Sequence, residues 1–329
     1  MVSLLRMNDS RDNATAHCCA ECGKAEGGGV ASLKSCKTCM RVKYCNAECQ
    51  HKHWPTHKAY CKIQAAKIRD EALFKDPPPM EECPICFLPM PTDIISCASL
   101  PPATISSVPI YDFAIANNEL ANEPMEKYYP CCGKTICRGC MYSSRKSGSD
   151  DQCPFCNSDR RSKTVEECVE EMMKRVEAND AASICLLANS YYQGLHGLQR
   201  DEERAIELFT KSAELGFSKA HSSLGSIYHE GGNMKKAKFH LEVAAKAGHE
   251  VARFNIGSME DNSGNMERAV KHWTIAASAG QYKAMHYLIT CFKKGFVGRE
   301  SIESTLAAYN ASSAEMRSEA RDAYIGIYL

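Results

Sequence analysis

The sequence lacks a net charge, a long apolar run and an N-terminal export signal, and each absence excludes a class of function. Its 40 Lys and Arg residues balance 40 Asp and Glu residues. This balance argues against nucleic acid as a partner, because phosphate binding needs a clustered positive surface. No run of about 18 apolar residues is present to span a membrane. Residues 1–8 form too short an apolar stretch for a secretory signal.

Spacings typical of a catalytic centre are also missing, whereas cysteine is abundant. Of the 20 cysteines, seventeen lie between Cys18 and Cys156, mostly as C-x-x-C pairs. Without an export signal we expect a cytoplasmic or nuclear protein, where thiols stay reduced and paired cysteines bind metal. Two C-x-x-C pairs can hold one tetrahedral Zn²⁺. The first half therefore reads as a series of zinc modules.

The first cysteine cluster has the ligand count of two zinc ions. Spacings of three or four residues on a helical stretch place both members of the last two pairs on one helix face. We prefer Cys19 to its neighbour Cys18, because Cys19 gives the regular two-residue spacing to Cys22. The predicted ligands are Cys19, Cys22, Cys36, Cys39, Cys45, Cys49, His57 and Cys61.

The residues between these ligands resemble a known family. Tyr44-Cys45, Cys49-Gln50, Trp54 and His57-Lys58, with Cys61, resemble the MYND zinc finger in order and spacing. The resemblance implies interleaved binding, with Cys19, Cys22, Cys45 and Cys49 on one zinc and Cys36, Cys39, His57 and Cys61 on the other. MYND fingers bind short proline-containing peptides, and Gln50 and Trp54 match the peptide-contacting part. Alternatively, Trp54 forms the small core of the finger.

The second cluster contains Cys83-Pro-Ile-Cys86, Cys131-Cys132, Cys137-Arg-Gly-Cys140 and Cys153-Pro-Phe-Cys156, and it resembles a RING finger. The resemblance implies one zinc on Cys83, Cys86, Cys137 and Cys140, and another on Cys131, Cys132, Cys153 and Cys156. Four zinc ions are then expected in the chain. An insertion over 87–130 holds Cys97, which is not assigned to a metal.

Three positions in this cluster bear on ubiquitin transfer. Lys134 stands where a RING finger carries histidine, so Cys132 substitutes in an all-cysteine variant. Asn157 follows the last ligand, where active ligases often carry a cationic residue. Ile85 and Pro154 match the apolar residues that dock a ubiquitin-conjugating enzyme, or they serve only local packing.

The second half shows a fixed period of 32 residues, which is typical of stacked helical repeats. The period relates Ala220, Ala252 and Ala284, and likewise Leu224, Ile256 and Leu288. Glycine at 216, 248 and 280 suits the left-handed position that ends a helix. Residues 187–216 resemble Sel-like repeats of the tetratricopeptide type. The resemblance implies a concave surface that binds an unidentified protein or peptide; alternatively, the array is a spacer.

The predicted architecture is multidomain, with two small cross-brace zinc modules followed by an all-α helical-repeat solenoid. A capping box at Thr164–Glu167 predicts a helix through Val176, and Cys168, Cys185 and Cys291 are expected in helix cores. The expected segments are a disordered terminus (1–17), a MYND-type finger (18–62), a helical linker ending in prolines (63–80), a RING-like finger (81–158), a connecting helix (159–180), repeats (181–295) and capping helices (296–329).

Two functions follow from this organisation. In the first, the chain is a zinc-binding adaptor that recruits partner proteins and catalyses nothing. In the second, the RING-like finger makes it a ubiquitin-protein ligase whose other modules select the substrate. Asn157 and the missing histidine favour the adaptor, whereas Ile85 and Pro154 favour the ligase.

Overall fold

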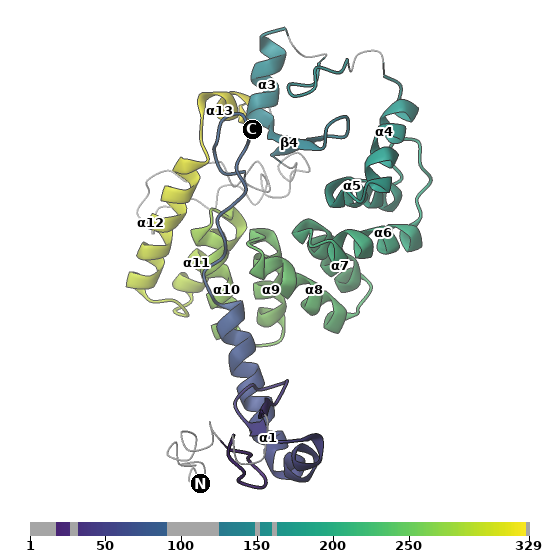
Figure 1. Cartoon of the computed structure of the whole chain (residues 1–329). Helices are drawn as coiled ribbons and strands as arrows, with labels where there is room; N and C mark the ends of the chain where they lie inside the picture. The colour runs from purple at the N-terminus through teal and green to yellow at the C-terminus, as the bar shows by residue number, and fades with distance from the viewer. Residues whose placement is uncertain (1–17, 27–31, 91–124, 149–151, 160–162, 327–329) are drawn as a thin grey trace. The chain divides into compact units, whose positions relative to one another are not determined.

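The computed structural model describes residues 18–26, 32–90, 125–148, 152–159 and 163–326 (Figure 1). The chain divides into two compact units, Met1–Lys75 and Asp76–Leu329. The predicted disordered segment 1–17 and most of the insertion, including Cys97, lie outside the described residues.

The first unit is a small hairpin followed by a long helix. Strands β1 (Lys34–Ser35) and β2 (Lys43–Tyr44) pair antiparallel. Helix α1 (Ala47–Leu73) begins at Asn46, whose side chain accepts a hydrogen bond from the Cys49 N–H at 2.9 Å. The sequence predicts a helical stretch to Lys62 and a second helix from Ile63. The structure instead has one helix that continues through Pro55 and ends before the three prolines at 77–79.

The second unit begins with the second cysteine cluster, hereafter the second zinc module (residues 81–159). Its strands β3 (Glu126–Tyr129) and β4 (Lys134–Cys137) form an antiparallel hairpin. Gly133 makes the turn with a φ of 71°, a conformation that glycine adopts without cost. Helix α3 (Arg138–Lys146) follows β4 directly, and the Cys137 side chain caps its first turn. One cysteine therefore serves as both strand end and helix cap.

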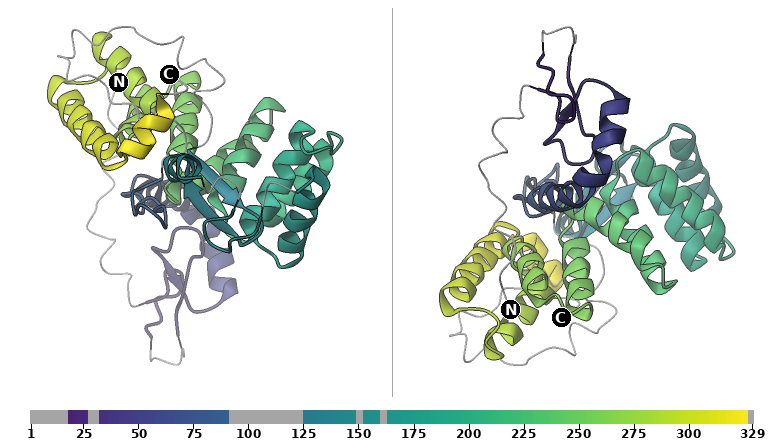
Figure 2. Two further views of the ribbon diagram at one scale, coloured as in Figure 1. Left: turned by 90° about the horizontal axis from the view of Figure 1, so that it is seen from above. Right: turned by 90° about the horizontal axis from the view of Figure 1, so that it is seen from below.

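The repeat array consists of antiparallel helix pairs, as the 32-residue period predicts (Figure 2). The first helices of successive pairs start 32 residues apart from α7 onward, and so do the second helices from α6 onward. The pairs are α5 (Ala181–Gln193) with α6 (Glu202–Glu214), α7 (Ser218–Glu230) with α8 (Met234–Lys246), α9 (Glu250–Asn262) with α10 (Met266–Ser278), and α11 (Tyr282–Lys293) with α12 (Arg299–Glu315). Gly216, Gly248 and Gly280 have φ values of 87°, 91° and 88°, which confirms their left-handed role.

Close packing within a pair depends on glycines facing large side chains. A Cβ at Gly225 would lie 2.6 Å from Leu241, and a Cβ at Gly257 would lie 2.5 Å from the Trp273 ring. Leu241 and Trp273 are each only 1% exposed. The large side chains at this repeat position therefore fill the space left by missing methyl groups on the facing helix.

The two ends of the array differ. Helix α4 (Val165–Glu177) precedes the repeats and has the predicted capping box at Thr164 and Glu167. At the other end, α12 packs against α10 and α11, whereas α13 (Glu319–Ile325) packs against α3 of the second zinc module. Among the described residues, none of the helices is long and apolar enough to cross a membrane.

Candidate metal centres

The structure brings the sixteen predicted ligands together in four groups of four. In each group the sulfur and nitrogen atoms all lie within 4.8 Å of one another. The groups are those that the two resemblances imply: Cys19, Cys22, Cys45 and Cys49; Cys36, Cys39, His57 and Cys61; Cys83, Cys86, Cys137 and Cys140; Cys131, Cys132, Cys153 and Cys156. Cys18 lies outside them and forms a strand bridge with Ala25.

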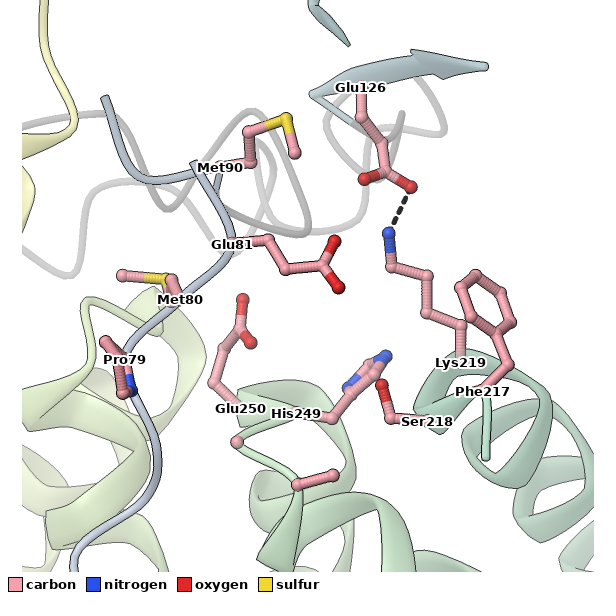
Figure 3. A pocket seen from close by; sticks show the side chains of 12 residues that line it. Pro79, Met80, Glu81, Met90, Glu126, Phe217, Ser218, Lys219, His249 and Glu250 are labelled. Atoms are coloured by element: carbon pink, nitrogen blue, oxygen red, sulfur yellow. Dashed lines mark hydrogen bonds and ion pairs between the residues drawn. The ribbon is translucent and has the colours of Figure 1, made fainter. Parts of the chain in front are cut away.

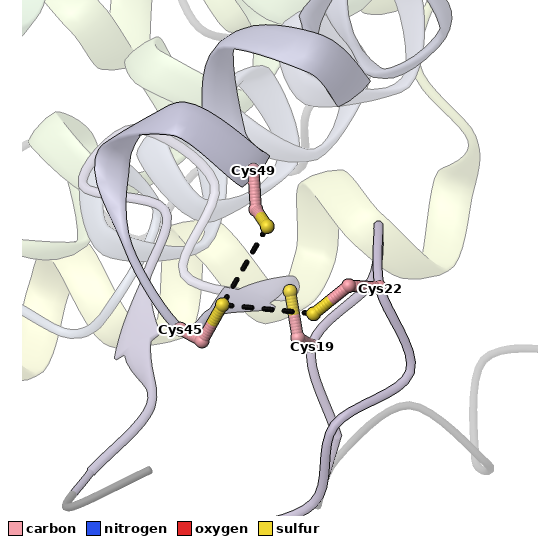
Figure 4. Close-up of side chains that lie close together, drawn as sticks. All are labelled: Cys19, Cys22, Cys45 and Cys49. Atoms are coloured by element: carbon pink, nitrogen blue, oxygen red, sulfur yellow. Dashed lines mark hydrogen bonds between the residues drawn. The ribbon is translucent and has the colours of Figure 1, made fainter. Parts of the chain in front are cut away.

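The distances within the groups fit a tetrahedral zinc ion. Zn–S bonds of about 2.3 Å place two sulfur ligands about 3.8 Å apart. The Sγ–Sγ distances are 3.6 Å for Cys22 and Cys45 and 3.5 Å for Cys45 and Cys49 (Figure 4). A disulfide would need about 2.05 Å. Four thiolates, or three thiolates and an imidazole, are donor sets that Zn²⁺ prefers, so the residues present fit zinc.

All four C-x-x-C turns have the same backbone conformation. The residue after the second cysteine is left-handed, with φ between 56° and 70°, and its N–H donates to the carbonyl of the first cysteine at 2.8–2.9 Å. These residues are Gly23, Met40, Phe87 and Asn157. Asparagine tolerates this conformation better than most residues. Backbone geometry thus provides a reason for Asn157 that is independent of ubiquitin transfer.

His57 is suited to bind metal as a neutral imidazole. Its Nε2 lies 3.4 Å from Cys39 Sγ, and its side chain is almost fully buried. Burial lowers the pKa of His57, and nearby His53 adds to the effect. In the neighbouring group, burial of Cys19 is outweighed by backbone N–H donors, chiefly that of Cys22, which lower its pKa to about 6. Both changes favour the deprotonated forms that ligate zinc.

The core of the first finger contains Tyr44 rather than Trp54. Tyr44 is 2% exposed and its hydroxyl lies 3.0 Å from His53 Nδ1. Trp54 is 39% exposed, with its ring edge-on to the His57 ring at 6.1 Å between centroids. Gln50 is half-buried on the same helix, α1. The side chain matched to peptide binding is therefore available on the surface, and a zinc ligand lies beside it.

The second zinc module holds its two groups through backbone donors as well as sulfur. The Cys137 N–H donates to Cys83 Sγ at 3.4 Å, and the Cys140 N–H donates to Cys137 Sγ at 3.4 Å. Hydrogen bonds with Cys137 and Cys140 lower the pKa of Cys83. The adjacent Cys131 and Cys132 contribute to one group, and Cys132 Sγ lies 3.6 Å from Cys153 Sγ. Lys134 is exposed and outside this group.

The apolar residues predicted to dock an enzyme are on the surface of this module. Ile85 is 41% exposed and Pro154 is exposed. Phe87 and Phe155, which the sequence interpretation did not single out, are also exposed. Their signal in the sequence is their position, since each lies beside a cysteine of a C-x-x-C turn that already carries one of the predicted residues.

Three remaining cysteines lie outside the four groups. Cys291 is buried in the core formed by α10, α11 and α12, and Cys185 packs against the core of the first two pairs. Burial raises the pKa of the Cys185 thiol to about 12, which keeps it protonated and inert. Cys168 is half-buried on α4.

Comparisons with known proteins agree with parts of this geometry. The MYND finger family model matches residues 19–61, and the Sel1 repeat model matches 181–217, 218–249 and 254–281. No RING family model matches the second zinc module.

A relative in Drosophila melanogaster, the zinc finger MYND domain-containing protein 10 homolog, is 43% identical over 50 residues. The match covers 15% of this chain and 10% of that protein, so it extends little beyond the finger.

Solved structures with similar helical arrays include a Sel1 repeat protein from Oxalobacter formigenes. It has a TM-score of 0.42 and 22% identity, over 54% of this chain and 71% of that one. Another is c5321 of uropathogenic Escherichia coli, with a TM-score of 0.38 and 23% identity over 51% and 40%. The chain therefore contains a MYND finger and an array of Sel1 repeats, with two further zinc-suited cysteine groups between them.

Proposed function

We propose that this protein is a zinc-dependent adaptor that recruits partner proteins. Its MYND finger binds a short proline-containing segment, and its Sel1 repeats bind a second protein. Both modules are protein-interaction modules, and the second zinc module adds exposed apolar side chains. The cysteines of the four groups have a structural role, because a thiolate bound to zinc is not available for catalysis.

The observation that carries the proposal is the placement of Trp54. Its 39% exposure is unusual for the larger of the aromatic side chains of so small a module. An exposed tryptophan beside a rigid zinc ligand provides a flat apolar surface on which a proline ring can stack. Because His57 fixes the adjacent turn of α1, little side-chain entropy is lost on binding.

The test compares Trp54→Ala with a matched control on the same helix. Ile63→Ala removes another exposed apolar side chain of α1, 57% exposed, after the last zinc ligand. Both variants are assayed for zinc content and for binding to an array of fluorescent proline-containing peptides. We expect Trp54→Ala to weaken binding at least tenfold with all zinc retained, and Ile63→Ala to bind normally. Equal binding by both variants would refute the peptide site at Trp54.

A ubiquitin ligase is the second candidate, and the interleaving of the second zinc module favours it. Its first and third cysteine pairs share one group, and its second and fourth pairs share the other. This order places the turns of Ile85 and Pro154 at the surface of a metal-stabilised module. In this function the module holds a ubiquitin-conjugating enzyme, while the MYND finger and repeats select the substrate.

Purified, zinc-loaded protein with ubiquitin, activating enzyme and a broad panel of conjugating enzymes separates the two functions. A ligase forms ubiquitin chains, and Ile85→Ala abolishes them, whereas Met234→Ala, on the repeat helix α8, does not. Absence of chains across the panel would leave the adaptor alone.

We place the protein in the cytoplasm or nucleus, because four thiolate-rich centres require a reducing compartment. Imaging of a tagged full-length chain tests the placement.

A further inference from the structure

The last helix of the chain completes the core of the second zinc module. Met316, Tyr324 and Ile325 pack in one cluster with Met125, Ile136, Met141 and the ligands Cys83, Cys137 and Cys153. Met316 and Tyr324 are almost fully buried. These residues lie about 180 positions beyond the module in sequence. A module that would otherwise have little apolar core thus obtains part of it from α13.

Arg321 of α13 is the polar centre of this contact. Its guanidinium is fully buried and donates from Nη1 to the Pro89 carbonyl at 2.7 Å and from Nη2 to the Leu88 carbonyl at 3.2 Å. Nη2 also lies 3.6 Å from Cys86 Sγ. A Zn²⁺ with four thiolates carries a net charge of about −2, and a buried cation beside it is stabilised by that charge. Arginine suits this place because its guanidinium is weakly hydrated and presents several donors in one plane.

The same helix contacts the metal centre a second time at Gly139. This glycine lies between the ligands Cys137 and Cys140 on the first turn of α3. A Cβ at Gly139 would lie 2.8 Å from the backbone N of Arg321 and 2.9 Å from its Cα. The backbone of α13 therefore rests directly on the turn that supplies two ligands, and only glycine leaves room for it.

The opposite side of the module is held by the start of the repeat array. The Tyr128 hydroxyl donates to Asp180 Oδ2 at 2.8 Å, and Arg175 Nε donates to the Pro130 carbonyl at 3.1 Å. Lys219 of α7 pairs with Glu126 of β3, beside a hollow that Glu81 and Glu250 also line (Figure 3). These contacts join the hairpin to α4, α5 and α7.

We propose that Arg321 is an outer-shell partner of the zinc centre of Cys83, Cys86, Cys137 and Cys140, and that occupancy of this centre and docking of α13 are coupled. Zinc orders the Cys86–Pro89 segment, which presents the carbonyls and sulfur that Arg321 binds. Docked α13 in turn neutralises charge on the thiolates and shields them from water. Because the module also binds α4, α5 and α7, zinc at this centre links the first and last helices of the array.

The first test uses the full-length, zinc-loaded chain and compares Arg321→Met with Arg317→Met. Arg317 is on the same end of the chain, but it is exposed and pairs with Asp322. Zinc transfer to a chromophoric chelator and mapped alkylation by N-ethylmaleimide report on each group of cysteines. We expect Arg321→Met to weaken zinc binding at one centre about 10–100-fold, with Cys83, Cys86, Cys137 and Cys140 alkylated first. Arg317→Met should match the wild type.

Arg321→Lys extends the test if Arg321→Met does not fold. Lysine keeps the charge but not the planar donors, so we expect a smaller defect at the same four cysteines. Wild-type zinc transfer and alkylation in the folded Arg321 variant would overturn the proposal.

The second test measures coupling in the other direction by hydrogen exchange. Gly139→Ala changes no ligand and no charge, and alanine is otherwise favourable in a helix. We expect it, like removal of zinc by a chelator, to accelerate exchange of the amides of α13 while exchange in α8 and α9 stays unchanged. Unchanged exchange in α13 after zinc removal would show that the helix docks independently of the metal, which contradicts the proposal.

Discussion

Replacement of Gly257 by alanine should destabilise the repeat array, although alanine is the better helix former. The added Cβ would lie 2.5 Å from Trp273 Nε1 and 2.6 Å from Cδ1. Ordinary contacts between such atoms are about 3.5–4.0 Å, so the methyl group is about 1 Å too close. Trp273 is 1% exposed and lies in the core of α10, α11 and α12, so the ring has no free space to enter.

Two opposing effects set the magnitude. Glycine to alanine in a helix interior gains about 1 kcal/mol. Overpacking of a filled core costs about 1–3 kcal/mol, and a rigid indole ring places this site at the upper end. We therefore expect a net loss of about 1–2 kcal/mol in the free energy of unfolding.

Urea unfolding of the zinc-loaded protein, followed by far-UV circular dichroism, measures this loss. The first helix pair provides the control, because Ala188 and Phe209 occupy the equivalent positions and are both buried. The double variant Gly257→Ala with Trp273→Phe recreates that pair, so it should be more stable than the sum of the two single changes implies. A Gly257→Ala protein as stable as the wild type, or additive effects in the double variant, would refute the packing argument.

Three further predictions concern metal, pH and capping. Native mass spectrometry should show four zinc ions, and Cys36→Ala should unfold its own finger, since structural zinc contributes about 10–16 kcal/mol, while the repeats keep their helical signal. Burial raises the pKa of Glu260, but Lys238 at 2.6 Å and Arg268 at 3.2 Å outweigh it and lower the pKa. Its contribution is therefore present above the unfolded pKa of about 4.3 and lost as pH falls through the folded pKa, so the stability gap to Glu260→Gln, about 2 kcal/mol at pH 7, should narrow on acidification. Thr164→Ala removes the cap of α4 and should cost about 1 kcal/mol in thermal unfolding; no shift in melting temperature would contradict that role.

The repeat array was largely predictable from the sequence, because its packing repeats with its residues. The left-handed glycines and the alanines at closest approach recur every 32 residues, and the helices begin with the same spacing. The last pair follows the same logic with the sizes exchanged. Ile289 and Thr305 stand where the previous pair has Gly257 and Trp273, and both are buried.

The grouping of the ligands was also predictable, since spacing and intervening residues define each turn. The role of Asn157 was not, because a left-handed φ is a property of the turn that only the backbone reveals. The docking of α13 lay beyond sequence reasoning for a different reason. Arg321 binds a carbonyl 232 residues away, and backbone carbonyls leave no signature in a sequence.

The attachment of both ends of the array to one zinc module has a consequence for how this protein can change in length. In an ordinary solenoid each unit contacts only its neighbours, so units are gained or lost without disturbing the rest. Here an inserted or deleted 32-residue unit would carry Arg321 away from the Cys86–Pro89 segment while Arg175 stayed on the Pro130 carbonyl. The number of repeats is thus fixed by a metal centre outside the array, and relatives that keep the second zinc module and Arg321 should keep the same repeat count.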